Sequence, residues 1–223
     1  MIRSAALTSD TFDQLVAHLI RSDGQEDLCF ALWRPSTGAS RTTAIISEPI
    51  LPLEGERHVH GNASFEPHYL DRALALALER RGGLAFLHSH PGPGWQGMSS
   101  DDISTESSRA ASTLAATGHP LVGLTIGSDG ALSARFWERA GPRQYERHWC
   151  ESVRIVGRKM LVTFDDTQRP PPKPLPTQVR TVSAWGTTRN RSSRGSASAS
   201  SAPAASAQLW PKHLPEPAFS TSD

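Results

Sequence analysis

The chain has 223 residues, enough for one ordinary domain and an extension, and its net charge of +1 gives no support for a nucleic-acid or anionic membrane partner. No apolar run reaches the length of a membrane span, and the N-terminal residues lack the apolar core of a signal peptide. The two cysteines, Cys29 and Cys150, are too few for a disulfide framework. Their apolar surroundings predict buried thiols in a reducing cytoplasm.

Hydrophobic periodicity predicts a mixed α/β domain with long helices between strands. The predicted elements are, in chain order, a helix over 11–21, strands over 26–33 and 42–51, a helix over 69–80, a strand over 84–88, a helix over 100–117, strands over 121–126 and 132–138, and an extended element over 153–164. Ser9 and Asp10 are candidate caps of the first helix, and Gly82 ends the second. The turn signal GSDG at 127–130 indicates a hairpin.

The composition changes near Asp165, where periodic apolar segments give way to RPPPKPLPTQ and then to RNRSSRGSASASSAPAASA. Sequence rich in proline, serine and alanine has too little apolar surface to offset the entropy cost of ordering. We therefore predict one folded domain over residues 1–164 and a disordered tail over residues 165–223.

The strongest chemical signal lies in residues 84–102, which read LAFLHSHPGPGWQGMSSDD. His88 and His90 stand two residues apart at the end of an apolar strand, so both imidazoles point to the same side. Pro91 ends the strand, and the glycine-rich loop after it can bring Asp102 back over the histidines. Two histidines and a carboxylate form a zinc site with a fourth position for water, which is typical of catalytic zinc.

A catalytic zinc site also needs a proton shuttle, and Glu26 is the candidate. Glu26 opens the otherwise apolar strand EDLCFALW, where its carboxylate could face a strand that carries the histidines and pass a proton to the leaving amine. Ser99, three residues before Asp102, is a candidate hydrogen-bond donor to the oxyanion. Taken singly, His-X-His is often structural, Ser-X-X-Asp is often a helix cap, and a lone Glu is often a surface charge. The order of all these features favours the metal site.

This order resembles the motif of the JAMM zinc metalloproteases (also MPN+ or JAB, the Mov34/PAD type), and of their bacterial members in particular. The family motif is an upstream Glu, His-X-His-Pro, a short loop and Ser-X-X-Asp. Here these are Glu26, His88-Ser-His90-Pro91 and Ser99-Ser-Asp-Asp102. The resemblance covers about residues 5–164. It implies a mostly antiparallel central sheet flanked by helices, with a cytidine-deaminase-like core, a bound Zn²⁺, and peptidase or isopeptidase action on ubiquitin-like proteins.

The loop between the second histidine and the serine departs from the family pattern. It has eight residues where the family usually has seven. Either the loop is longer by one residue, or Met98 takes the serine position and Asp101 becomes the ligand. We prefer Ser99 and Asp102, because they keep the Ser-X-X-Asp pair.

Other residues near the motif receive weaker assignments. His58 and His60 form a second His-X-His, with His68 nearby, but no Ser-X-X-Asp follows, so we expect strand residues beside the site. Trp95 lies in the Gly-Pro loop next to the metal ligands, where an aromatic ring could hold an extended peptide.

The tail suggests a second hypothesis. Residues 195–207 read GSASASSAPAASA, and in the neighbouring frame, with GC-rich codons, they can become RLRVGIVGAGSVG, followed by AVAEALAR. A strand, a Gly-X-Gly-X-X-Gly loop and a helix start form a nucleotide-binding fingerprint. We infer a frameshift near residues 185–190 of a longer protein, in which this domain preceded an adenylating domain similar to ubiquitin-activating (ThiF-like) enzymes. An ordinary low-complexity tail is the alternative.

Two alternative functions stay open. One is a metal-free MPN-type scaffold that binds partners, although a pure scaffold has no need of the Glu, both His and the Asp together. The other is a RadC-like protein, since that family shares the His-X-His-Pro and Ser-X-X-Asp pattern and is linked to DNA repair. The near-neutral charge and the missing helical DNA-binding region count against it.

Overall fold

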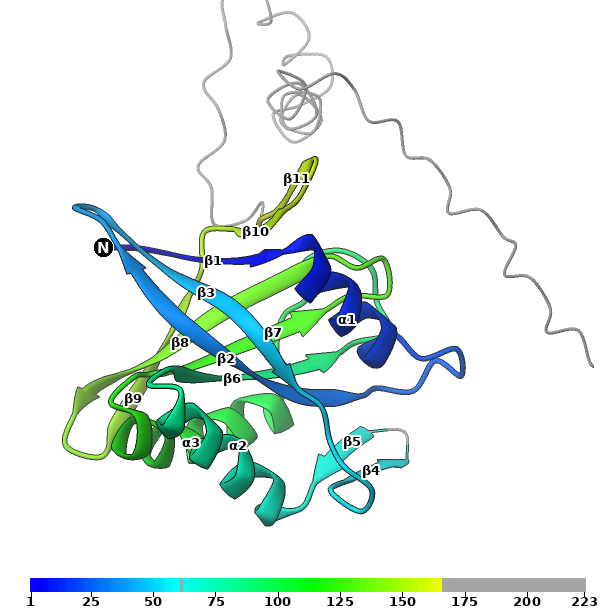
Figure 1. Ribbon diagram of the computed structural model, residues 1–223, viewed down its shortest axis with the longest axis horizontal. Helices are drawn as coiled ribbons and strands as arrows, with labels where there is room; N and C mark the ends of the chain where they lie inside the picture. The colour runs from blue at the N-terminus through cyan, green and yellow to red at the C-terminus, as the bar shows by residue number, and fades with distance from the viewer. Residues whose placement is uncertain (61, 166–223) are drawn as a thin grey trace, which may run out of the picture. The chain divides into compact units, whose positions relative to one another are not determined.

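The computed structural model describes residues 1–60 and 62–165 (Figure 1). The elements are β1 (Ile2–Thr8), α1 (Ser9–Leu19), β2 (Leu28–Thr37), β3 (Arg41–Ile50), β4 (Arg57–His60), β5 (Asn62–Phe65), α2 (Pro67–Glu79), β6 (Gly83–Ser89), α3 (Ser100–Thr117), β7 (Leu121–Ile126), β8 (Leu132–Gly141), β9 (Gln144–Trp149), β10 (Val153–Val156) and β11 (Met160–Thr163). The tail predicted over 165–223 lies outside the described residues, apart from Asp165, and so does the segment with the inferred frameshift.

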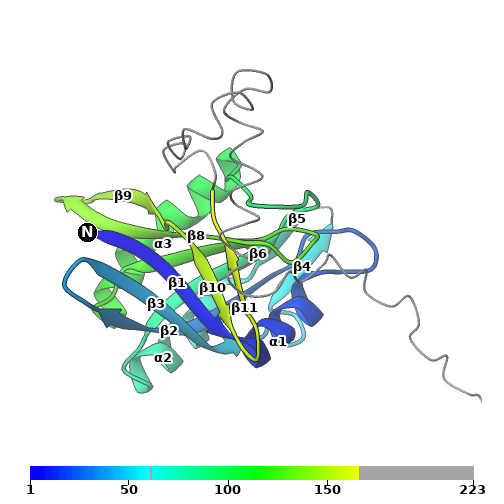
Figure 2. The same ribbon diagram turned by 90° about the horizontal axis from the view of Figure 1, so that it is seen from above.

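Most strands belong to one large mixed sheet. Its order within the described residues is β11-β10-β1-β3-β2-β6-β7-β8-β9, and β4 pairs with β5 in a separate hairpin. β1 runs parallel to β3 and β10, and β6 runs parallel to β7, whereas the other five neighbouring pairs are antiparallel. The sheet curls, so that β1 and β10 come close to β8 (Figure 2). The prediction of a mixed α/β fold is confirmed.

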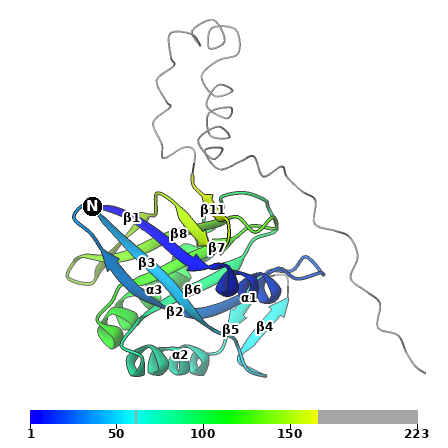
Figure 3. The same cartoon turned by 45° about the horizontal axis from the view of Figure 1, so that its top comes forward.

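The two faces of the central strands pack against separate apolar cores, which explains why β2 and β6 read as continuous apolar runs. Trp33 of β2 belongs to a cluster with Leu15 of α1. Phe30 points to the opposite face and belongs to a cluster with Tyr69 of α2 and Ala110 of α3. α2 therefore lies on the side of the sheet opposite to α1 (Figure 3).

In the described part of the chain the three predicted helices are present, but the first covers 9–19 instead of 11–21 and the second covers 67–79 instead of 69–80. Thr8, rather than Ser9 or Asp10, is the N-cap of α1, because its hydroxyl oxygen accepts the amide N–H of Thr11 at 3.2 Å. α3 has the predicted bounds. In the described part of the chain, no helix is both long and apolar enough to cross a bilayer.

Several strand predictions need correction. The strand predicted over 26–33 begins at Leu28, so Glu26 lies in the loop before β2 rather than on a strand. The extended element predicted over 153–164 is a hairpin, since the chain turns between Val156 and Met160 to pair β10 with β11. The sequence prediction also omits β1, which has small buried residues, and β9, whose polar side chains mask its strand character.

The thiols of Cys29 and Cys150 are free and buried, as the sequence predicts. Burial raises the pKa of both thiols, that of Cys150 to about 12. Burial and a raised pKa are typical of structural cysteines rather than reactive ones.

Candidate metal centre

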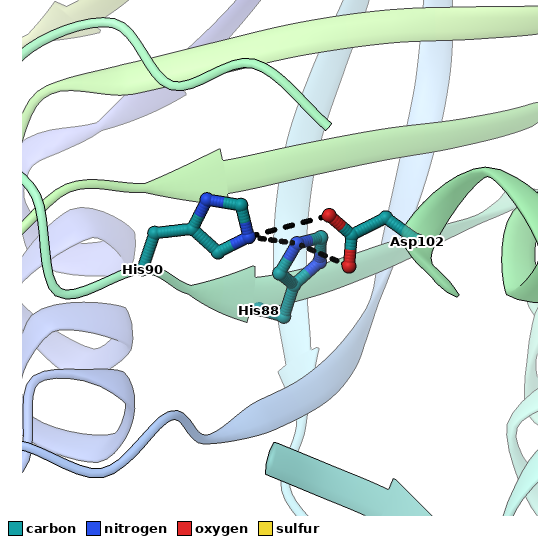
Figure 4. A group of neighbouring side chains, drawn as sticks. All are labelled: His88, His90 and Asp102. Carbon is teal, nitrogen blue, oxygen red and sulfur yellow. Dashed lines mark hydrogen bonds and ion pairs between the residues drawn. The ribbon is translucent and has the colours of Figure 1, made fainter. Parts of the chain in front are cut away.

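His88, His90 and Asp102 meet beside the end of β6, with their ring nitrogens and carboxylate facing one another (Figure 4). Nε2 of His88 lies 3.2 Å from Nε2 of His90 and 3.3 Å from Oδ1 of Asp102. Nε2 of His90 lies 3.3 Å from Oδ2 of Asp102. The structure thus brings the three predicted ligands together, and the group could hold a metal ion.

The central position of β6 explains where the histidines lie. His88 pairs in register with Leu28 of β2 on one side and Thr125 of β7 on the other, so its side chain is almost fully buried. β6 ends at Ser89, but the amide N–H of His90 still donates to the carbonyl oxygen of Ile126 at 2.9 Å. Both histidines are therefore held by backbone pairing within the sheet.

The glycine-rich loop after His90 is anchored on the turn between β7 and β8. Ser128 N–H donates to the carbonyl oxygen of Gly92 at 2.9 Å, and Gly94 N–H donates to Oδ1 of Asp129 at 2.9 Å. A side chain at Gly127 would place its Cβ 2.8 Å from the carbonyl oxygen of Gly94, so the close approach requires glycine there. This contact directs the chain back toward the histidines and into α3.

A capping box at the start of α3 fixes Asp102, the third candidate ligand. Ser99 is the N-cap: its hydroxyl oxygen accepts Asp102 N–H at 3.1 Å, and Asp102 Oδ2 accepts Ser99 N–H at 2.7 Å. Capping and metal ligation, which the sequence offers as alternatives, are therefore compatible at Asp102. Asp101 lines the same cavity but is exposed and lies outside the cluster.

The donor distances fit a metal ion. Ligand atoms about 2.0–2.1 Å from a tetrahedral ion stand about 3.3 Å apart, close to the 3.2–3.3 Å observed between the donor atoms of His88, His90 and Asp102. Two imidazole nitrogens and a carboxylate suit a first-row divalent metal. The donor set and its spacing therefore match a three-ligand metal site.

The charges of the cluster are coupled. Burial alone would raise the pKa of Asp102, but its hydrogen bonds with His88 and His90 outweigh burial and hold that pKa far below its usual range. The hydrogen bond to Asp102 in turn raises the pKa of His90. Asp102 is thus kept as the ionised carboxylate, the form that binds a metal.

A buried ion pair lies behind the cluster. Arg135 and Glu106 are fully buried and bonded to each other, and Trp137 Nε1 donates to Glu106 at 2.6 Å. Arg135 also donates to Thr125 Oγ1 at 2.6 Å, and that hydroxyl lies 3.3 Å from His88 Nε2. Because Glu106 follows Asp102 by one helical turn, this network ties the end of α3 that carries Asp102 to β7 and β8.

Sequence analysis missed this network, although it contained a signal. Arg135 is a charged residue among the buried residues of β8, and buried charges occur mostly in pairs. Gly123 gives a second signal, since a Cβ there would collide with the side chains of Arg135 and Glu106. Without the fold, neither residue could be matched to its partner, because they belong to elements far apart in the sequence.

Glu26 shares a cavity of about 540 Å³ with the three ligands. Its neighbour Asp27 is buried and bonded in both directions to Ser89, the residue between the histidines: Asp27 N–H donates to Ser89 Oγ at 2.9 Å, and Ser89 N–H donates to the Asp27 carbonyl at 3.0 Å. Arg57 of β4 pairs with the Asp27 carboxylate at 2.9 Å. The loop before β2 is therefore fixed against β6, with Glu26 at the cavity.

The weaker assignments lie outside the cluster. His58 and His60 fall on β4, as expected of strand residues, and His58 is exposed and pairs with Glu66 at 2.8 Å. Trp95 is half-buried and lies 6.0 Å from the ring of Trp149, packed against the α1-side core. Its contact with a peptide stays a prediction.

A scan against protein-family models finds no match to this chain, and a search of the curated proteins finds none either. The function is therefore argued from the residues and their geometry.

Proposed function

We propose that the chain is a zinc-dependent metallopeptidase of the JAMM type, which hydrolyses a peptide or isopeptide bond at the C-terminus of a ubiquitin-like protein. The observation that carries the proposal is the convergence of His88, His90 and Asp102 in a cavity that Glu26 also lines. Four side chains of the right chemistry, from three separate segments, face one space. The order of these residues in the sequence resembles the JAMM motif, and the substrate class rests on that resemblance alone.

Zinc is the metal we propose, because two imidazoles and one carboxylate with an open position are typical of catalytic zinc. Bound there, zinc would act as a Lewis acid that polarises the scissile carbonyl and makes water a better nucleophile. The protein would supply the rest of the reaction. The carboxylate of Glu26 would accept the proton of the attacking water and deliver it to the leaving amine.

Ser99 has a second role in this proposal. Its hydroxyl oxygen already accepts a hydrogen bond from Asp102 N–H, so the hydroxyl proton remains for donation. Ser99 lines the same cavity, where that proton could stabilise the negative charge on the substrate oxygen. We place Ser99 and Glu26 as the residues that act on the substrate.

The experiment that tests this function is hydrolysis of a ubiquitin-like protein fused through its C-terminus to a fluorogenic leaving group. The zinc-loaded protein should turn over the fusion, a chelator should abolish turnover, and added zinc should restore it. Glu26→Gln should bind zinc normally and lower kcat by about 10²–10⁴-fold, whereas Glu54→Gln, an exposed residue on another loop, should not. Equal rates for wild type and Glu26→Gln would refute the assigned base.

The alternatives predict different results in the same experiment. A metal-free MPN-type scaffold would show no chelator-sensitive turnover and no bound zinc. A RadC-like protein would bind zinc without acting on the fusion. An adenylating, ThiF-like partner is proposed from the tail alone, and sequencing the gene for an open downstream frame tests it.

A further inference from the structure

The cavity continues from the metal centre along α3 to Arg109. Asp102, Thr105 and Arg109 all line it, and their spacing of three and four residues puts them on one face of the helix. At 1.5 Å per residue, Arg109 stands about 10 Å along the helix axis from Asp102. Among the described lining residues, Arg109 is the one with a permanent positive charge.

Aromatic rings form the wall between the metal centre and Arg109. The ring centroids of His88 and Phe86 are 5.6 Å apart, and those of Phe86 and Phe65 are 5.8 Å apart. The guanidinium carbon of Arg109 lies 5.8 Å from the centroid of Phe65. Phe86 and Phe65 line the cavity as well, so it offers an apolar wall with a cation at its far end.

Arg109 is half-buried, yet its guanidinium has few hydrogen-bond partners in the described part of the chain. Its Nε is buried without a hydrogen-bond partner, whereas its Nη1 donates to Ser108 Oγ at 3.1 Å. In the described part of the chain, no carboxylate lies within ion-pair distance of it. Other arginines do have such a carboxylate, namely Arg3, Arg21, Arg41, Arg57, Arg72 and Arg135.

These features together favour an anionic ligand. A buried donor without an acceptor costs free energy, and the ring of Phe65 satisfies part of the charge but no N–H group. The guanidinium fork matches a carboxylate in geometry and charge. A ligand carboxylate would therefore accept hydrogen bonds from the guanidinium of Arg109, while the rest of the ligand would lie against Phe86 and Phe65.

We propose that this end of the cavity is a subsite for a substrate carboxylate, and that Arg109 determines specificity for it. Helix side chains lean toward the N-terminus, so Arg109 reaches back toward Asp102. An extended peptide covers about 3.3–3.6 Å per residue. The carboxylate should therefore lie about two or three residues from the hydrolysed bond. This inference rests on the proposed hydrolase and narrows its substrates to segments with an acidic side chain or a free C-terminus at that distance.

The test uses probes that carry a hydroxamate, which binds metal, joined to one to four glycine residues ending in a free carboxylate or its amide. A second series ends in an amide and has Glu or Gln as its last residue. Dissociation constants are measured by calorimetry on the zinc-loaded full chain. At a length of two or three residues, the carboxylate probe should bind about tenfold or more tighter than its neutral match.

Variants connect this preference to one residue. Arg109→Met and Arg109→Gln should abolish it, and Arg109→Lys should keep part of it. The control is Arg147→Met: Arg147 also lies over an aromatic ring, 5.2 Å from that of Trp149, but is not a cavity residue, and the preference should survive. Thermal unfolding of each variant identifies any loss of fold.

Each outcome decides the inference. A preference only in the Glu series supports a side-chain carboxylate, and one only in the free-carboxylate series supports a C-terminus. The subsite is overturned, with the metal centre intact, if wild type binds the charged and neutral probes of each series equally. An unchanged preference for the charged probes in Arg109→Gln overturns it as well. If acetohydroxamate and all the probes fail to bind the zinc-loaded protein, the proposed metal centre fails, and the subsite falls with it.

Discussion

Ser89, which separates the two histidines, exchanges hydrogen bonds with Asp27, which follows Glu26. Ser89 Oγ accepts Asp27 N–H at 2.9 Å, and the Asp27 carbonyl accepts Ser89 N–H at 3.0 Å. Both residues are buried. The middle residue of the His-X-His motif therefore holds the proposed base beside the candidate metal ligands, a link that no local sequence pattern reveals.

Ser89→Ala should keep zinc binding and lower kcat. The change leaves the buried Asp27 N–H without its acceptor, at a cost of about 1–3 kcal/mol, and loosens the loop that carries Glu26. The measurement is kcat on the fusion substrate together with the zinc dissociation constant. Ser4→Ala is the matched control, because Ser4 is a buried serine that bonds to Thr43 at 2.8 Å away from the cavity. An equal fall in kcat for both variants would contradict a positioning role for Ser89.

Asp102→Asn should weaken zinc binding by about a hundredfold or more, beyond the effect typical of losing an outer-shell partner. Asp101→Asn should leave zinc affinity near that of wild type, because Asp101 is exposed and outside the cluster. Competition with a fluorescent chelator measures both constants. The reverse ranking would mean that the ligand register is shifted by one residue, as the longer loop allows.

Arg135→Met should lower the free energy of unfolding by about 3–5 kcal/mol, because it leaves the carboxylate of Glu106 buried without its cation. Glu106→Gln should also be destabilising, because it leaves the guanidinium of Arg135 buried without its anion. The double variant Arg135→Met/Glu106→Leu should cost less than the sum of the single changes. Urea unfolding measures all of them, and additive losses would rule out a coupled pair.

Glu56 links the segment after β3 to α2 through its ion pair with Arg72. We expect this pair to stabilise the fold at neutral pH and to lose its effect in acid. The hydrogen bond with Arg72 lowers the pKa of Glu56 below the ordinary value of 4.5. A carboxylate with a depressed pKa stabilises the fold above its unfolded pKa, and the contribution is lost as pH falls through the folded pKa.

Glu56→Gln should therefore be less stable than wild type at pH 7, and the difference should vanish as pH falls well below 4.5. Urea unfolding of both proteins across pH 3–7 measures it. Glu54→Gln, on the exposed part of the same segment, is the control. A constant difference between Glu56→Gln and wild type at every pH would contradict the assigned ion pair.

The sequence predicted the ligand triad because its signals are local. His88 and His90 lie together at the end of β6. Asp102 belongs to a Ser-X-X-Asp capping pattern, whose spacing is set by the geometry of the first helical turn. The mixed α/β class also follows from local periodicity, and α3 and β7 have the predicted bounds. These features depend on residues that are close together in the sequence, so they can be recognised without knowledge of the fold.

Features that depend on long-range pairing were not predicted. The contact of Ser89 with Asp27 spans 62 residues, and the pairing of Arg135 with Glu106 spans 29. β9 is polar on its exposed side and is defined by its partner β8 rather than by its own apolar residues. The order of the strands likewise emerges only from tertiary packing.

The central claim is that His88, His90 and Asp102 form a metal centre, and zinc content tests it most directly. After loading with zinc and dialysis, atomic spectroscopy should find about one zinc per wild-type chain, almost none in His88→Ala, and an unchanged amount in His58→Ala, which removes an exposed histidine outside the cluster. Wild type without bound zinc, or equal retention of zinc by His88→Ala, would contradict the account.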